Sequence, residues 1–240
     1  MKREEYFFNP FRLISPKLDA EATRLEELYE KTPEEVTCLE EGLLIMTNKL
    51  IRIVELARKA LIIWDPAKAE MCEGLAREIH DEEKSLTGQI VCSPTETTGQ
   101  VLKTVVLFPG RLERVGDHLE SILNVACIKA RDGVPFSDRA SAELDELFNL
   151  FADALKHFQD ALLTRNKAVL EHLIAQDKKI AQKTIEAASA HEDRLCQGDC
   201  SPKASSLFLD ILESIRAASS HVRQMSENLL KIDANQAKRA

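Results

Sequence analysis

The residues best suited to chemistry in this chain lie between Arg111 and Ile122, in the run Arg-Leu-Glu-Arg-Val-Gly-Asp-His-Leu-Glu-Ser-Ile. Glu113 and Asp117 are four residues apart, so a helix places both carboxylates on one face, with Cβ atoms about 6 Å apart. Two anions at that separation repel each other unless a cation lies between them. Carboxylate oxygens suit divalent or ferric ions. The run therefore predicts a metal-binding helix face, to which Glu120 adds a carboxylate; a solvated acidic face is the alternative.

Three further residues in or beside the run bear on such a site. His118 is a candidate ligand, or a hydrogen-bond donor to a ligand. Gly116 costs about 1 kcal/mol relative to Ala in a helix interior, which indicates close approach of another helix or of a metal-bound group. Pro109 predicts a kink just before the run, because proline removes one backbone hydrogen bond; a helix divided into two at this point is the alternative.

The composition favours helices and argues against a nucleic-acid partner. The chain has 240 residues, enough for one large domain or two small ones. Aromatic residues are only 5% of the chain and Ala, Leu, Glu and Lys are abundant, which argues against a β-rich core. The formal charge of −8 is poorly suited to binding a phosphate backbone.

Cysteine usage and hydropathy indicate a cytoplasmic location. The sequence contains no run of about 18 apolar residues, and its N-terminus lacks the apolar stretch of a secretory signal. The six cysteines are expected to be reduced thiols. Cys196 and Cys200 form a C-x-x-x-C pair without a second such pair, which is weak support for zinc.

Helix-start signals divide the chain into repeated units. Capping residues followed by apolar periodicity predict six main helices, over 32–63, 65–91, 93–133, 137–164, 166–196 and 201–232. Matching caps recur at offsets of about 100 to 108 residues, which indicates a duplicated three-helix unit. The predicted fold is all-α, with two homologous antiparallel three-helix bundles.

The predicted domains follow from these units. An aromatic arm with a short helix occupies 1–31, the first repeat 32–134, the second repeat 135–233, and a polar tail 234–240. The arm contains Tyr6, Phe7, Phe8 and Phe11. It either packs back onto the body or docks on a membrane or a membrane protein.

The run Leu112 to His118 resembles the signature of the PhoU family of phosphate-uptake regulators, in which leucine is followed by Glu-Arg-Ile-Gly-Asp and often His. The resemblance implies two three-helix repeats, each ending in a signature helix, with metal ions or iron clusters on its carboxylates. It also implies an acidic residue in the preceding helix, for which Asp81 is the candidate. The expected ligands are Glu113, Asp117, Asp81 and His118, and the expected metal is iron, zinc or manganese.

The second repeat departs from this pattern. Residues 172–230 resemble the variant of the domain at the C-terminus of sodium–phosphate cotransporters, with Asp177 as the acidic residue of the preceding helix. If His221 takes the place of the signature histidine, Arg216 replaces the expected Glu and Ser220 the expected Asp. Both ligand positions are then lost. Arg216 is hypothesised to occupy the vacated cation space, because a guanidinium can neutralise nearby carboxylates.

Three functions fit the residues. The resemblance implies a regulator without a catalytic step that contacts a phosphate transporter, a sensor histidine kinase, or both, reaches the membrane through that partner, and forms a homodimer. A metal-free helical scaffold is the second hypothesis. A metal-dependent phosphohydrolase is the third, against which the sequence has neither a Gly-rich phosphate loop nor an H-E-x-x-H motif.

Overall fold

The structure, a computed structural model, describes residues 34–92 and 105–237, with side chains over 39–89 and 105–232. The chain divides after Cys38, and the account below concerns the unit Leu39–Ala240. The described residues form six helices and no strand: α2 (Glu34–Ile62), α3 (Pro66–Cys92), α5 (Phe108–Arg131), α6 (Asp138–Thr164), α7 (Lys167–Cys196) and α8 (Pro202–Ala237). The predicted aromatic arm, its short helix and the caps at Thr32 and Ser93 lie outside the described residues. None of the described helices is long and apolar enough to span a membrane.

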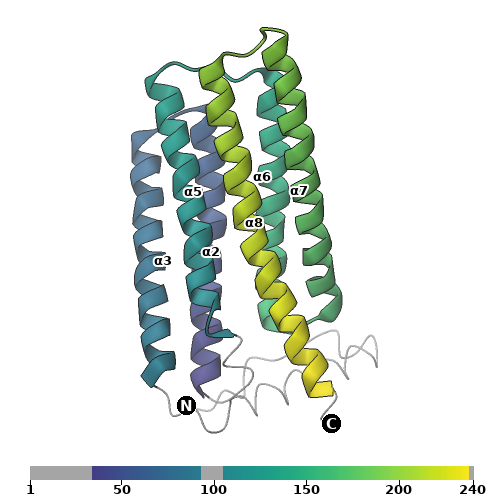
Figure 1. Cartoon of the computed structure of the whole chain (residues 1–240). Helices are drawn as coiled ribbons and strands as arrows, with labels where there is room; N and C mark the ends of the chain where they lie inside the picture. The colour runs from purple at the N-terminus through teal and green to yellow at the C-terminus, as the bar shows by residue number, and fades with distance from the viewer. Residues whose placement is uncertain (1–33, 93–104, 238–240) are drawn as a thin grey trace, which may run out of the picture. The chain divides into compact units, whose positions relative to one another are not determined.

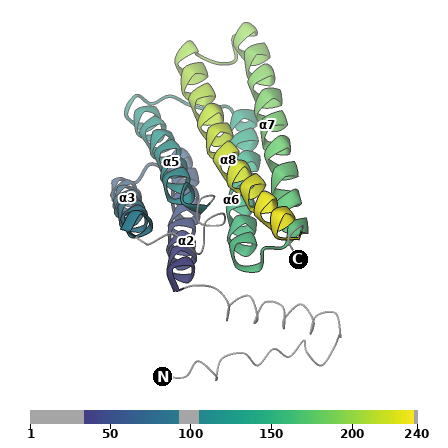
Figure 2. The same cartoon turned by 60° about the horizontal axis from the view of Figure 1, so that its bottom comes forward.

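Successive helices run in opposite directions, as predicted (Figure 1). In Figures 1 and 2, α5 lies between α3 and α8, while α8 also contacts α6 and α7. The α5–α8 contact therefore joins the first three helices to the last three. The all-α prediction is confirmed for the described residues.

The helix starts obey local capping rules, which is why the sequence predicted them well. Ser137 accepts a hydrogen bond from the Ala140 N–H at 3.2 Å, and Asn166 accepts one from the Ala168 N–H at 2.8 Å. Gly198 ends the α7 region with φ of +79°, the left-handed conformation that glycine adopts without strain. The last helix exceeds its prediction, since α8 continues beyond Ile232 to Ala237.

Of the two interpretations of Pro109, the divided helix is confirmed and the kink within a continuous helix is wrong. Pro109 lies in the first turn of α5, which begins at Phe108 after a turn at 106–107. The first N–H groups of a helix have no intrahelical acceptor, so proline loses nothing there. The helix that carries the Glu113 run therefore starts only a few residues before it.

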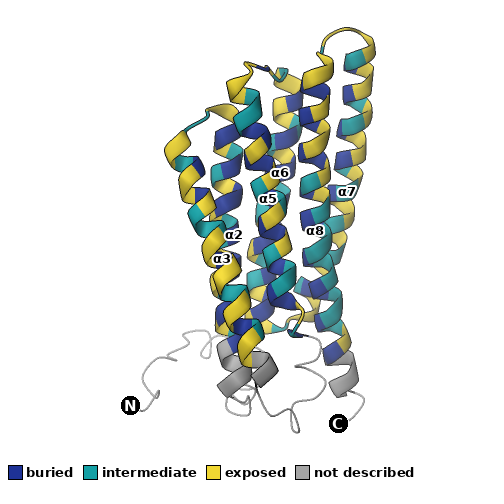
Figure 3. Cartoon of the chain, turned by 60° about the vertical axis from the view of Figure 1, so that its left-hand side comes forward, coloured by how far each residue is buried: buried dark blue, intermediate teal, exposed yellow. Residues whose placement is uncertain are grey.

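One apolar core runs through the helices of both halves (Figure 3). The dark faces of the helices point inward and the exposed faces outward, as amphipathic helices require. The largest fully buried side chains include phenylalanines from both halves: Phe108, Phe148, Phe151, Phe158 and Phe208. This shared core makes the six helices one packing unit.

Polar contacts made by three arginines also join the two halves. Arg58 of α2 contacts Asp145 of α6, with 2.6 Å between Nε and Oδ1. Arg165, which follows α6, pairs with Glu40 of α2. Arg111 of α5 donates a hydrogen bond to the side-chain oxygen of Gln224 on α8.

The glycine at position 42 marks a close approach of α2 to α3. A Cβ atom added there would lie 2.6 Å from Leu86 Cδ2, and the Leu86 side chain is buried. Gly74, within α3, has nothing within 4 Å of its added Cβ. A substitution by alanine at Gly42 therefore adds a steric clash to the change in helix propensity, whereas the same substitution at Gly74 changes only the helix propensity.

We expect Gly42→Ala to lower the free energy of unfolding by about 1–2 kcal/mol, since overpacking against Leu86 outweighs the gain in helix propensity. Gly74→Ala should raise it by about 0.5–1 kcal/mol. Urea denaturation of both variants is the measurement. Equal stabilisation by the two substitutions would contradict the close approach.

Candidate metal-binding face

The rotation of α5 is set by its buried residues. Leu112, Val115 and Leu119 are fully buried, so the residues beside them point along the flanks of the helix. Glu113 and Asp117 are four residues apart on one flank, and Glu120 continues the same row. This flank faces α3, because the Glu113 carboxylate contacts the ring of His80.

The contact between Glu113 and His80 is direct. Glu113 Oε1 meets His80 Nδ1, with exposed side-chain fractions of 29% and 49%. One helical turn further along α3, the Glu83 carboxylate lies 4.0 Å from the position of a Cβ added at Gly110. The antiparallel register of α3 and α5 thus places an imidazole and further carboxylates beside the Glu113 row.

Glu120 is surrounded by negative charge. Its pKa is raised, first because burial disfavours the charged form, and then because of the charges on Asp117 and Glu73; Arg77 acts in the opposite direction. We refer to Glu73, His80, Glu113, Asp117 and Glu120 as the α3–α5 acidic face. Its excess negative charge would be relieved by a bound cation.

The structure does not bring all four predicted ligands together. Asp117 lies on the row with Glu113, but Asp81 is exposed and makes no hydrogen bond or ion pair with a described residue. His118 is five residues from Glu113, or about 140° around the helix. Its ring stacks on His221 of α8, with 5.7 Å between ring centroids. The ligand roles of Asp81 and His118 stay predictions.

His80 and Glu73 are the residues of this face that sequence reasoning did not select, and His80 is the one that contacts Glu113. A signal for it existed in α3, where Cys72, Ile79 and Leu86 recur every seven residues and are buried. Asp81 lies about 200° around the helix from Ile79, on the solvent side, whereas His80 lies on the flank. The sequence does not show which side of α3 faces α5, and His80 could not be selected without that information.

Gly116 has an ordinary environment. A Cβ added there would lie 3.8 Å from Leu50 Cδ2 of α2, a normal van der Waals distance. The residue is buried between helices, but the packing does not demand glycine. The predicted close approach therefore occurs at Gly42 rather than at Gly116.

The equivalent residues of α8 are arranged differently. His118 and His221, which the sequence comparison placed at matching positions of the two halves, stack on each other. In the same register, Arg216, Ser220 and Arg223 correspond to Glu113, Asp117 and Glu120. The hypothesis that Arg216 fills a cation space is not supported, because Arg216 is 54% exposed and pairs with Glu213 on its own helix.

The donor chemistry of the α3–α5 acidic face fits a metal ion. Carboxylate oxygens and imidazole nitrogen are the ligands that divalent manganese, iron and zinc take. Among the described side chains, however, no group of three or more His, Cys, Asp and Glu residues stands ready to enclose an ion. The α3–α5 acidic face thus offers possible metal ligands in a row along the side of α5 that faces α3, without enclosing a site.

Comparison with known proteins identifies the class of fold. No protein-family model matches the sequence, and no curated protein matches it either. Among solved structures, the phosphate transport system regulatory protein PhoU from Streptococcus pneumoniae aligns with a TM-score of 0.74 and 15% identity, over 84% of this chain and 96% of that one. PhoU from Pseudomonas aeruginosa aligns with a TM-score of 0.75 and 18% identity, over 84% and 98%. The chain has a PhoU-like fold.

The crowding of charge at Glu120 leads to a pH-dependent prediction. Its raised pKa means that the folded state takes up this proton more readily than the unfolded state, so Glu120 costs stability as the pH rises through its folded pKa. We expect Glu120→Gln to raise the free energy of unfolding by about 0.5 kcal/mol at pH 7. The gain should vanish below the ordinary titration range of glutamate.

Urea denaturation at several pH values in the presence of a chelator measures this effect. Glu41→Gln, an exposed residue of α2, is the control because it changes the net charge equally. A gain of the same size in both variants would show that net charge, and not the α3–α5 acidic face, is responsible.

Proposed function

We propose that this chain regulates phosphate uptake or phosphate signalling by binding protein partners, without catalytic turnover. The observation that carries the proposal is the PhoU-like fold, which extends over 84% of the chain and over nearly all of two PhoU structures. One of those proteins is described as a regulator of a phosphate transport system. The signature run on α5 supports the same role.

The proposed partner is a phosphate transporter or a sensor histidine kinase at the cytoplasmic face of the membrane. The chain would reach the membrane through this partner, and self-association into a homodimer is part of the proposal. The α3–α5 acidic face is suited to such contacts, because its charged side chains are partly exposed and would attract a basic surface.

We further propose that the α3–α5 acidic face binds iron, zinc or manganese through Glu113, Asp117 and His80. The two carboxylates would supply negative charge and His80 an imidazole nitrogen. A bound ion would crosslink α3 to α5 and offset part of the negative charge of the face. The contact of Glu113 with His80 across the two helices supports this assignment.

The metal proposal is tested by elemental analysis of protein purified without chelators. We expect about one or more equivalents of iron, zinc or manganese in the wild type, and loss of that metal in Glu113→Gln/Asp117→Asn, which removes two anionic ligands. Glu41→Gln is the control, since it removes an exposed carboxylate of α2 and should retain the metal.

Two outcomes would change the proposal. Equal metal content in all three proteins would place the ion elsewhere. No metal in any of them, even after reconstitution, would favour the metal-free scaffold.

The regulatory proposal is tested by binding to the phosphate transporter and the sensor kinase of the same cell. We expect saturable binding to at least one of them, weakened about tenfold by Glu113→Gln/Asp117→Asn, which corresponds to about 1.4 kcal/mol. Binding should also weaken with salt if the acidic face takes part. Glu41→Gln should bind as the wild type does.

A phosphatase assay on the same preparations distinguishes the enzyme hypothesis. We would conclude that the protein is a phosphohydrolase, and not a regulator, if two results were found together. The wild type would show turnover that Glu113→Gln/Asp117→Asn abolishes, and neither partner would bind.

A further inference from the structure

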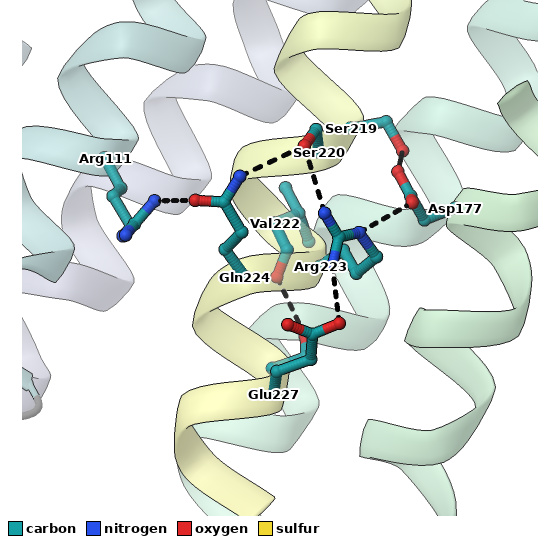
Figure 4. Close-up of polar contacts among 9 residues, drawn as sticks. Arg111, Asp177, Ser219, Ser220, Val222, Arg223, Gln224 and Glu227 are labelled. Carbon is teal, nitrogen blue, oxygen red and sulfur yellow. Dashed lines mark hydrogen bonds and ion pairs between the residues drawn. The ribbon is translucent and has the colours of Figure 1, made fainter.

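Arg223 lies at the centre of a polar cluster in the second half of the molecule (Figure 4). Its Nε is 3.0 Å from Oδ2 of Asp177 on α7, and its Nη1 donates to Glu227 one turn further along α8. The exposed side-chain fractions of Arg223 and Asp177 are 28% and 15%. The guanidinium is thus held between two carboxylates from two helices.

The remaining oxygen of Asp177 is also occupied. Ser219 donates its hydroxyl to Asp177 Oδ1 at 2.7 Å, while Ser220 Oγ lies 3.4 Å from Arg223 Nη2. Both carboxylate oxygens therefore have a partner, and the Ser220 hydroxyl lies beside the guanidinium. Within the described residues, this is a satisfied arrangement of two anions, one cation and two hydroxyls.

The cluster stands where the first half has its acidic face. Arg223 is the counterpart of Glu120, and Ser220 is the counterpart of Asp117. At Glu120, burial raises the pKa of the carboxyl first, and the charges on Asp117 and Glu73 raise it further. At Arg223, one guanidinium offsets one of the two carboxylates that it contacts. A metal ion placed there would meet a guanidinium in the space that it needs.

We propose that Arg223 is an internal cation that takes the place of a metal ion in the second half of the molecule. It crosslinks α7 to α8 through Asp177, as a metal would through shared carboxylates. The comparison with a metal ion rests on the metal site proposed for the first half, whereas the test below measures the second half alone. Arg216, the residue that sequence alone suggested for this role, does not fill it.

The cluster also reaches the first half. Gln224 donates to Ser220 Oγ at 3.1 Å, and its carbonyl oxygen accepts a hydrogen bond from Arg111 of α5 (Figure 4). Arg111 stands two residues before Glu113. The internal cation is therefore tied by hydrogen bonds to the helix that carries the acidic face.

The test uses the full chain carrying Glu113→Gln/Asp117→Asn, so that the first half contributes no metal response. Thermal melting is measured after chelation and again with excess Mn²⁺, a cation that accepts carboxylate and hydroxyl ligands. Into this background we introduce Arg223→Ser, Arg223→Lys, or the control Arg216→Ser, which removes an exposed arginine of the same helix.

Without metal, Arg223→Ser should lower the melting temperature by about 5 °C, because it leaves two carboxylates facing each other. Mn²⁺ should restore most of that loss in Arg223→Ser, and Asp177→Asn added to it should abolish the response. Arg223→Lys should keep most of the stability and show no Mn²⁺ response. Arg216→Ser should melt as the background does.

An unchanged melting temperature in Arg223→Ser would overturn the proposal, and so would a loss that Mn²⁺ does not restore. Should Arg223→Ser fail to fold, electron paramagnetic resonance of Mn²⁺ mixed with the background protein decides the question. The proposal expects no Mn²⁺ bound at Asp177. Bound Mn²⁺ that disappears on Asp177→Asn would overturn it.

Discussion

The burial of α5 against α8 constrains the position of every polar group described above. The two helices pack together, and both bury apolar residues, among them Leu112 and Leu119 on α5 and Val222 and Met225 on α8. Removing these side chains from water is worth roughly 1.5–3 kcal/mol each, which outweighs the value of a surface ion pair. The buried faces therefore fix the rotation of both helices. With this rotation, Glu113 of α5 contacts His80 of α3, and Arg223 of α8 contacts Asp177 of α7.

The features predicted correctly from the sequence are those decided by nearby residues. Caps such as Ser137 and Asn166 act within three residues, so their effect can be read without knowing the fold. The sequence left two interpretations of Pro109 open, because its missing N–H is equally compatible with a kink and with the first turn of a new helix, and only the start of α5 at Phe108 distinguishes them. The contact of His80 with Glu113 and that of Arg223 with Asp177 depend on which flanks of two helices face each other. Periodicity along one helix does not contain that information.

The likeness to the PhoU structures at 15% and 18% identity has a physical explanation. Helix length, turn position and the period of apolar residues are enough to define a bundle of this kind, and many different side chains satisfy them. The charged residues are under no such restriction, since they lie at the flanks of the helices. Two proteins can therefore share the arrangement of helices while the two halves of one chain differ in how they balance charge.

The guanidinium between Asp177 and Glu227 has a consequence for the number of partners that the protein can hold. A molecule built from two equivalent halves offers two equivalent surfaces and can bridge two copies of the same partner. Because an arginine offsets part of the negative charge in the second half, the two halves would differ in their attraction for a basic partner. Complexes formed through the α3–α5 acidic face would then have a single orientation and one partner per chain. The two halves would then share an arrangement of helices, while the chain would bind only one partner molecule through such a surface.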